Sequence, residues 1–216
     1  MAHSSKLLLI GFIYLCALPC ARAQINPDDI TIIRDKWGVP HIFAPKDEQV
    51  AYGLGWATAE DNFHDMQENI LPVRGRTAEY KGKKGAIMDV FAHLMNVNGL
   101  VESSYDTSFS DKFKTVLDGY CQGVNAYAIA HPNEVLLKKV FPISPKDVVK
   151  AYTFSLAFMT HVHFDLGKIF RGHIKRHEMN VGVGSNGMAL SSTKTKDGKT
   201  YLAINSHQPL EGPFAW

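Results

Sequence analysis

The chain has 216 residues, of which 45% are hydrophobic, with 23 lysines and arginines against 21 aspartates and glutamates. This length suffices for one domain with a substantial core, or for one domain and part of another. A charge so close to balance argues against a protein that binds nucleic acid or an anionic membrane through bulk positive charge.

Residues 1–23 have the features of a secretory leader. Lys6 supplies positive charge, residues 7–18 form an apolar run, and residues 21–23 (Ala-Arg-Ala) fit an A-x-A cleavage site. The apolar run is short for a membrane-spanning helix, so we expect export to the periplasm or the medium without stable membrane insertion. A lipid anchor on Cys20 is the less favoured alternative.

Removal of this leader takes away two basic residues and leaves 21 basic and 21 acidic residues, with Cys121 as the remaining cysteine. An exported protein with one cysteine has no intramolecular disulfide and must depend on its core. We predict that Cys121 is a small buried apolar residue rather than a nucleophile, because no cation or base is evident beside it.

Two short strands and a long helix are predicted first. Residues 29–34 and 40–44 are β-rich and flank a turn at 37–39. After Asp47, which can cap a helix, apolar residues recur at helical spacing as far as Ile70. Small residues on this helix would allow another backbone to approach closely: Gly53, Gly55, Ala57 and Ala59.

The middle of the chain is less uniform. Residues 81–85 indicate a basic, solvated turn, and residues 87–108 give an ambiguous signal. Ser110 is predicted to cap a helix whose apolar stripe runs through residues 113–128 and ends at residues 131–133.

Ser144, Pro145 and Asp147 predict another helix start, with a capping serine, a proline in the first turn and an acid three residues after the cap. Residues 148–162 are apolar nearly all round, so we expect this helix to be buried on most faces. Residues 167–180 are basic and polar, which is typical of an exposed connector.

A β-hairpin is predicted near the end of the sequence. Residues 188–191 and 200–204 are β-rich, and the Asp197-Gly198 pair between them is a good hairpin signal. The glycine-rich stretch 181–187 precedes the hairpin and contains Ser185. Taken alone, this stretch predicts only a loop, because Gly, Ser and Asn are common in turns.

Four segments together resemble the penicillin acylase family of N-terminal-nucleophile hydrolases, which includes penicillin G acylases, cephalosporin acylases and acyl-homoserine-lactone acylases. The segments are residues 33–42, residues 53–61 followed by Met66, residues 74–79, and residues 184–186 leading to Asn205-Ser206-His207. The chain departs from the family pattern at Asn62, where an arginine is usual, and at Ser206, where a proline is common.

The resemblance implies an organisation for the chain. The full enzyme would be an α+β protein with an αββα sandwich, and this portion would be mainly helical with short strands and a C-terminal β-hairpin. Residues 24–167 would form the α subunit, residues 168–184 the linker or spacer with the cleavage junction, and residues 185–216 the start of the β subunit. The partner would be the chain's own β subunit, in a heterodimer formed by processing.

The resemblance also implies the chemistry. The precursor would cut itself between Gly184 and Ser185, by attack of the serine hydroxyl on the preceding carbonyl and hydrolysis of the resulting ester. The freed α-amine of Ser185, with a reference pKa of about 8, could then take the hydroxyl proton. His207 would orient the amine or the hydroxyl, or assist proton transfer.

The implied substrate is an N-acyl compound such as an acyl-homoserine lactone or a β-lactam antibiotic, and the histidine at position 207 favours the lactone. An apolar pocket would select the acyl chain by burial, at about 0.8 kcal/mol per methylene. Its predicted residues, for which an ordinary core role is an equal alternative, are Phe154, Phe158, Met159, His161 and Gln208.

No cofactor or metal is expected, although a structural calcium ion is left open. The pairs His161/His163 and His173/His177 have zinc-compatible spacing, but no cysteine or glutamate motif completes either pair. The basic residues from Lys168 to Arg176 fit a solvated linker better than a nucleic-acid site. Two other functions stay open: a truncated, non-catalytic fragment, and a secreted helical binding protein that shares only the fold.

Overall fold

The computed structural model describes residues 24–159, 162, 168 and 185–206. Its elements are η1 (Pro27–Asp29), β1 (Thr31–Arg34), β2 (Pro40–Phe43), α2 (Asp47–Val73), α3 (Thr77–Lys81), α4 (Lys83–Leu94), α5 (Val97–Ser108), α6 (Asp111–Ala130), η2 (Lys138–Val140), α7 (Pro145–Met159), β3 (Ser185–Leu190), η3 (Ser192–Lys194) and β4 (Tyr201–Ser206). The prediction of a mainly helical portion with short strands and a C-terminal hairpin is confirmed. The predicted leader and most of the connector at 167–180 lie outside the described residues.

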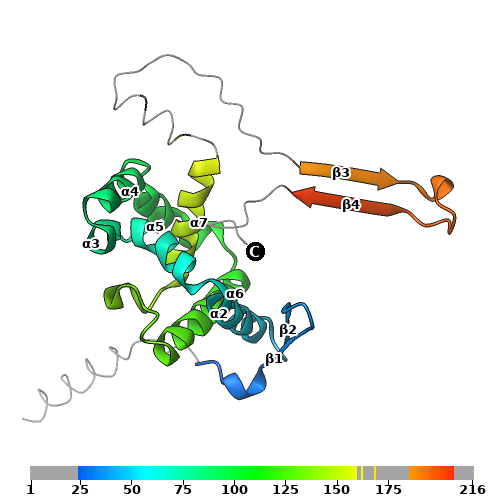
Figure 1. Cartoon of the computed structure of the whole chain (residues 1–216), viewed down its shortest axis with the longest axis horizontal. Coiled ribbons are helices and arrows are strands. Elements are labelled where there is room, and N and C mark those ends of the chain that lie inside the picture. The colour runs from blue at the N-terminus through cyan, green and yellow to red at the C-terminus, as the bar shows by residue number, and fades with distance from the viewer. Residues whose placement is uncertain (1–23, 160–161, 163–167, 169–184, 207–216) are drawn as a thin grey trace, which may run out of the picture.

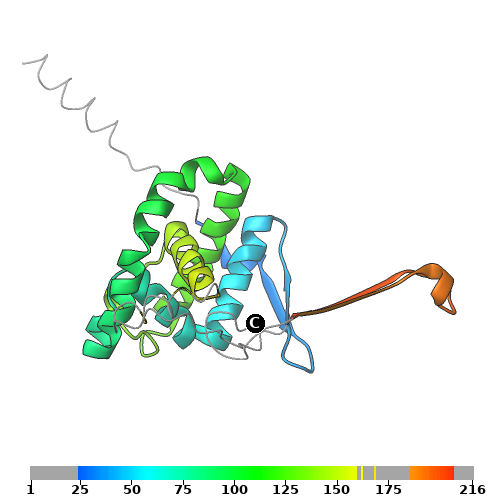
Figure 2. The same ribbon diagram turned by 90° about the horizontal axis from the view of Figure 1, so that it is seen from above.

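The two hairpins are placed differently. Figure 1 shows the helices gathered into one body with β1 and β2 against it, while β3 and β4 stand apart from that body. Figure 2 shows the same separation from a second direction. Among the described helices, none is long and apolar enough to cross a membrane.

Helices α2 and α6 pack backbone against backbone. A Cβ atom on Gly55 would overlap the carbonyl oxygen of Tyr120, and a Cβ atom on Gly123 would overlap the carbonyl oxygen of Tyr52. Only glycine fits at such positions, because any side chain would push the helices apart. The expectation that small residues on α2 allow close approach is confirmed at Gly55.

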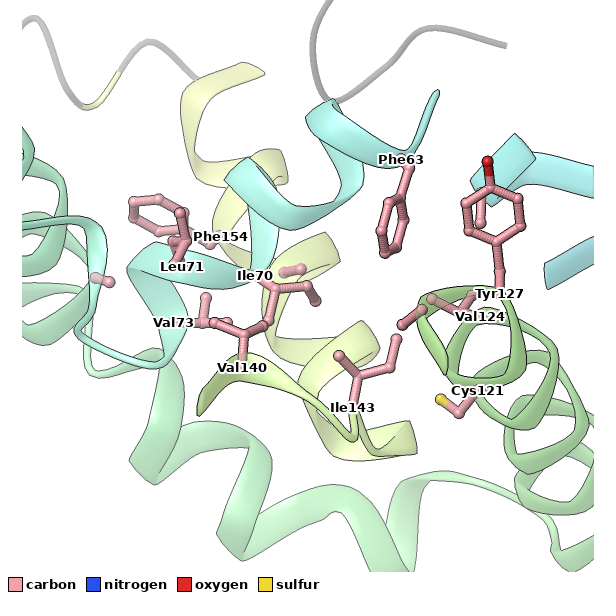
Figure 3. Close-up of a cluster of buried hydrophobic side chains, with 14 of the residues drawn as sticks. Phe63, Ile70, Leu71, Val73, Cys121, Val124, Tyr127, Val140, Ile143 and Phe154 are labelled. Atoms are coloured by element: carbon pink, nitrogen blue, oxygen red, sulfur yellow. The ribbon is translucent and has the colours of Figure 1, made fainter. Parts of the chain in front are cut away.

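The core joins α2, α6, α7 and the connection between α6 and α7. Figure 3 shows its buried side chains, including Phe63, Ile70, Leu71, Val73, Val124, Val140 and Ile143. Cys121 belongs to the same cluster and is 2% exposed, which confirms that it is a buried apolar residue. The helical body therefore has a continuous core of its own.

The predicted starts of α6 and α7 are confirmed. The Ser110 hydroxyl accepts a hydrogen bond from the Phe113 N–H at 3.3 Å. At α7, the Ser144 N–H donates to Asp147 Oδ2 at 2.8 Å, and the Asp147 N–H donates to Ser144 Oγ at 3.4 Å. This reciprocal pair satisfies backbone donors at the helix start.

The expected burial of α7 on most faces is confirmed in part: of residues 148–157, three are buried, five are half-buried, and Tyr152 and Leu156 are exposed. Tyr152 is 61% exposed and Leu156 is 52% exposed, because α7 packs on α2, α5 and α6 and leaves another side uncovered among the described residues.

The prediction that Asp47 caps α2 is wrong. Lys46 occupies the N-cap position of α2, and Asp47 lies in the first turn, 2.8 Å from Lys112 Nζ.

The expected exposed turn at 81–85 is present but confined to Gly82, which has φ of 62° and separates α3 from α4. Gly85 is buried inside α4, and a Cβ atom there would overlap the carbonyl oxygen of Thr77. The ambiguous stretch 87–108 forms most of α4 and α5, which are joined through Asn96 in a left-handed conformation with φ of 51°.

The C-terminal hairpin is longer than predicted. β3 and β4 are antiparallel, from the pair Ser185–Ser206 to the pair Leu190–Tyr201. Apolar side chains are exposed on both of its faces: Met188 is 58% exposed and Ile204 is 73% exposed. Because alternate residues of a strand point to opposite faces, neither face of this ribbon is polar throughout.

Candidate functional site

Ser185 is the first residue of β3 and its side chain is exposed. It lies opposite Ser206, the last residue of β4, so the antiparallel register brings the two ends of the hairpin together. Gly184 and His207, the residues that adjoin this pair along the chain, lie outside the described residues. The roles predicted for Gly184, Ser185 and His207 stay predictions.

A cleft of about 710 Å³ lies between the β1–β2 turn, α2, α6 and α7. Its polar groups include Asp61, Asn62 and Asp65, and its apolar wall includes Leu54, Ile70, Leu117, Val124, Phe141 and Val148. Small-molecule sites have volumes of about 300–1,000 Å³ and a similar balance of apolar and polar groups. The cleft can therefore hold an apolar molecule or an apolar segment of protein.

Part of the predicted acyl pocket can be compared with this cleft. Phe154 is 4% exposed and belongs to the core cluster, whereas Tyr152 and Ser155 of the same helix line the cleft. Phe158 and Met159 belong to the last turn of α7, but their side chains are not described. His161 and Gln208 lie outside the described residues, so the pocket stays a prediction.

Helix α2 is kinked where it borders the cleft. Asn62 has φ of −139° and ψ of 35°, which are not helical values, and its side chain is in the cleft lining. Asn62 is also one of the positions where the chain departs from the penicillin acylase family pattern, in which an arginine is usual here. Asn62 and the neighbouring Asp61 both have low helix propensity, which is a local signal for this kink.

Arg34 connects β1 to the residues before this kink. Its guanidinium donates to Glu60 Oε2 at 2.6 Å, to Asp61 Oδ2 at 3.1 Å and to the carbonyl oxygen of Gly38 at 2.7 Å. The hydrogen bonds to Glu60 and Asp61 raise the pKa of Arg34. This charged cluster links the first two segments that carry the family resemblance.

Asp35 shapes the turn between β1 and β2. Its Oδ1 accepts the N–H of Trp37 at 2.8 Å and the N–H of Val39 at 3.0 Å. These backbone hydrogen bonds, that of Trp37 first, lower the pKa of Asp35. The turn holds Trp37, which is 79% exposed, at the cleft.

The third resembling segment begins with Arg74, which binds the start of α7. Its Nε donates to Asp147 Oδ1 at 2.9 Å and its Nη2 donates to Asp147 Oδ2 at 2.6 Å. Burial raises the pKa of Asp147, but the hydrogen bonds from Arg74 and Ser144 lower it more, so the net direction is down. Three of the four resembling segments thus hold the helical frame together.

Tyr120 lies on the α6 wall of the cleft. Burial raises the pKa of its phenol to about 12, and a hydrogen bond with Thr58 opposes this only in part. The phenol is therefore protonated at physiological pH. It contributes hydrogen bonding and apolar surface to the cleft rather than charge.

No group of three or more histidine, cysteine, aspartate or glutamate side chains that could hold a metal ion occurs among the described residues. The zinc-compatible pairs His161/His163 and His173/His177 lie outside that part of the chain.

The family description "Penicillin amidase" matches residues 29–216. The chain belongs to the penicillin amidase family. The match begins before β1 and includes the cleft, the Arg34 and Arg74 contacts, and Ser185. The resemblance carried by the four segments is therefore confirmed.

Several members of the penicillin amidase family are similar to this chain. It is 26% identical to the acyl-homoserine lactone acylase PvdQ of Pseudomonas putida, over 88% of this chain and 29% of that protein. It is 29% identical to penicillin G acylase of Escherichia coli, over 61% of this chain and 16% of that protein. A solved thermostable penicillin G acylase from Alcaligenes faecalis, in tetragonal form, gives a TM-score of 0.48 at 21% identity and covers 72% of this chain and 96% of that chain.

The chain spans less than a third of the length of these two curated relatives.

Proposed function

We propose that this chain is the N-terminal part of an exported acylase precursor, which cuts itself before Ser185 and then hydrolyses the amide bond of an N-acyl substrate. The observation that supports this most is the position of Ser185, exposed at the first residue of β3 and opposite Ser206. A cut before such a residue leaves a free amine at the end of an ordered strand. Membership of the penicillin amidase family supports the same reaction class.

The cut transfers the chain from nitrogen to oxygen. The Ser185 hydroxyl attacks the carbonyl carbon of Gly184, the C–N bond breaks, and the former amide nitrogen becomes the α-amine of Ser185. Water then hydrolyses the ester and restores the hydroxyl. Glycine at position 184 leaves the attacked carbonyl unobstructed.

The freed amine supplies the base for substrate hydrolysis. Its reference pKa of about 8 means that a useful fraction is unprotonated at neutral pH. It takes the proton of the Ser185 hydroxyl, which attacks the acyl carbonyl and releases the amine product. Water then attacks the acyl ester, and His207, next in the chain after Ser206, orients the reacting groups.

The substrate is an amide between an apolar acyl group and a polar amine. The names of the relatives, an acyl-homoserine lactone acylase and a penicillin G acylase, support this class. Residues 24–167 form the α subunit, 168–184 the linker and junction, and 185–216 the start of the β subunit in this proposal. Export through the leader at 1–23 places the reaction in the periplasm or outside the cell.

Intact-mass measurement on the full-length precursor tests the cut. The wild type should separate into two chains, the second beginning at Ser185, and Ser185→Ala should stay whole. Ser192→Ala is the matched control, because Ser192 is another exposed serine of the same hairpin and should leave cleavage unchanged. Folded wild-type protein that stays uncut would contradict the proposal and favour a non-catalytic protein.

Activity is tested on the same preparations, by release of the amine from an N-acyl-homoserine lactone and from penicillin G. The processed wild type should hydrolyse at least one of them, and Ser185→Ala should hydrolyse neither. Activity retained by Ser185→Ala would assign catalysis to another residue.

A further inference from the structure

A second cleft, of about 550 Å³, lies where residues 24–29 pass the start of α2 and the first half of α6. The charged side chains of its lining are Asp29, Lys46, Glu48, Asp111, Lys114 and Asp118. Lys114 is already paired, at 3.4 Å from Asp111 and 3.9 Å from Asp106. The rest of the cleft therefore has more negative than positive charge.

The side chain of Gln49 provides an independent sign of a ligand. Gln49 is 9% exposed and lines this cleft, and its Nε2 donates to Asp29 Oδ2 at 3.1 Å. Its other polar atom, Oε1, is buried and has no hydrogen-bond partner among the described residues. A buried acceptor without a donor is costly, so the site favours a ligand that carries N–H groups.

The chain itself brings a nitrogen to this cleft. The Ile25 N–H donates to Gln122 Oε1 at 3.0 Å, and Gln122 Nε2 donates to Asp118 Oδ2 at 2.9 Å. Gln24, one residue earlier, is exposed and also lines the cleft. Since consecutive Cα atoms are only about 3.8 Å apart, the anchor at Ile25 keeps the Gln24 nitrogen at the cleft.

We infer that this cleft binds the α-ammonium group of the chain itself, formed when the leader is cut between Ala23 and Gln24. The inference rests on the proposed leader and does not involve the nucleophile. Water breaks the Ala23–Gln24 amide bond, the carboxylate stays on Ala23, and the Gln24 nitrogen is mostly protonated at neutral pH, since its reference pKa is about 8. One amide N–H is thereby replaced by three donors and a positive charge, which suit Gln49 Oε1 and the carboxylates of Asp29 and Glu48 in the cleft lining.

This docking has a chemical consequence that can be measured. An N-terminal glutamine cyclises when its unprotonated α-amine attacks the side-chain Cδ. The new N–Cδ bond forms, the bond from Cδ to the amide nitrogen breaks, and ammonia leaves. A protonated amine that is held in the cleft cannot attack, so docking should protect Gln24 from cyclisation.

The test uses the full-length exported protein, with the start of its α chain at Gln24 verified by intact mass. The protein is incubated with glutaminyl cyclase, and loss of ammonia from the α chain is followed by mass spectrometry. Gln49→Leu should cyclise about tenfold faster than wild type. Loss of a hydrogen bond to a charged group should weaken docking by about that factor, and the undocked amine is free to react. Asp47→Asn is the matched control, since Asp47 pairs with Lys112 outside the cleft lining and should leave the rate unchanged.

Equal rates for wild type and Gln49→Leu would overturn the inference, as would an α chain that starts at another residue. If Gln49→Leu does not fold, Asp29→Asn takes its place with the same expectation. The assay is repeated on Ser185→Ala, which need not be self-cleaved. Failure of the proposed acylase function is thereby distinguished from failure of the docking.

Discussion

The helical body buries its apolar side chains, whereas the β3–β4 hairpin leaves its apolar side chains exposed. In the body, Leu71 and Val124 are at most 1% exposed, and α2 touches α6 through glycines. In the hairpin, Leu202 is 70% exposed and Ile204 is 73% exposed. A two-stranded hairpin on its own is marginal in water, so the body is stable through its own contacts and the hairpin is not.

The family segments in the two regions also differ in what they contribute. The family segments in the body make structural contacts, such as those of Arg34 and Arg74, whereas the segment in the hairpin holds the proposed nucleophile. A ribbon with apolar side chains on both faces is typical of strands inside a layered fold. The exposed hairpin therefore agrees with the αββα sandwich expected for the full enzyme.

The largest loss of stability is expected when volume is added at a buried glycine of the body. Gly123→Val should lower the free energy of unfolding by more than about 3 kcal/mol, because the new side chain must separate α6 from the Tyr52 carbonyl. Gly187→Val, in β3, is the control: no described atom lies within 4 Å of its Cβ position, and we expect little change. Urea unfolding followed by circular dichroism measures both, and equal losses would contradict the assignment of the core to the body.

The ion pair that connects α2 to α7 should have the next largest effect. Asp147→Ala should cost about 3 kcal/mol, because it leaves the partly buried Arg74 guanidinium without its carboxylate. Asp47→Ala, which removes the exposed pair with Lys112, should cost less than about 1 kcal/mol. Similar losses of unfolding free energy for the two variants, measured in urea, would contradict the larger contribution expected from the Arg74–Asp147 pair.

The same pair predicts a pH dependence. The pKa of Asp147 is lowered in the folded protein, so its contribution is complete above the unfolded value of about 3.9 and is lost as the pH falls through the lower folded value. The unfolding free energy of wild type should thus fall in acid more steeply than that of Asp147→Asn. Parallel curves for the two proteins would refute this.

A smaller effect is expected at the turn. Arg34→Met should cost about 1 kcal/mol, because its ion pairs with Glu60 and Asp61 are partly exposed. Amide hydrogen exchange should accelerate at residues 35–39, which the Arg34 contact with Gly38 helps to hold. Lys112→Met removes an exposed pair elsewhere and should leave exchange in this turn unaltered.

The smallest effect on stability is expected from a substitution in the hairpin. Ile204→Thr should change the stability of the chain by less than about 0.5 kcal/mol, because Ile204 is exposed. Val124→Thr places a hydroxyl in the core of the body and should cost about 1–3 kcal/mol. A large loss from Ile204→Thr would mean that the hairpin packs on the body.

What the sequence predicts here depends on how local the signal is. Ser110 and Ser144 identify helix starts, because a cap is formed by residues three apart in the chain. The stretch 87–108 gave no clear pattern, since α4 and α5 are short and meet at a left-handed Asn96. Exposure of Tyr152 depends on which neighbours α7 has, and composition does not encode that.

The two parts of the candidate site differ in the same way. Ser185 could be singled out because four segments occur in a recognisable order. The cleft could not, because its walls come from the β1–β2 turn, α2, α6 and α7, which meet only in the folded chain. The roles of Gly184, Ser185 and His207 remain predictions that the mass and activity measurements address.

The break in α2 at Asn62 changes the course of the helix without dividing the core. Before the break, Gly55 touches the Tyr120 carbonyl of α6. After it, the ring of Phe63 lies 5.1 Å from that of Tyr127, also on α6, and Arg74 just beyond the helix binds Asp147 of α7. Both segments of α2 are thus held by α6, and the non-helical residue between them is left to line the larger cleft.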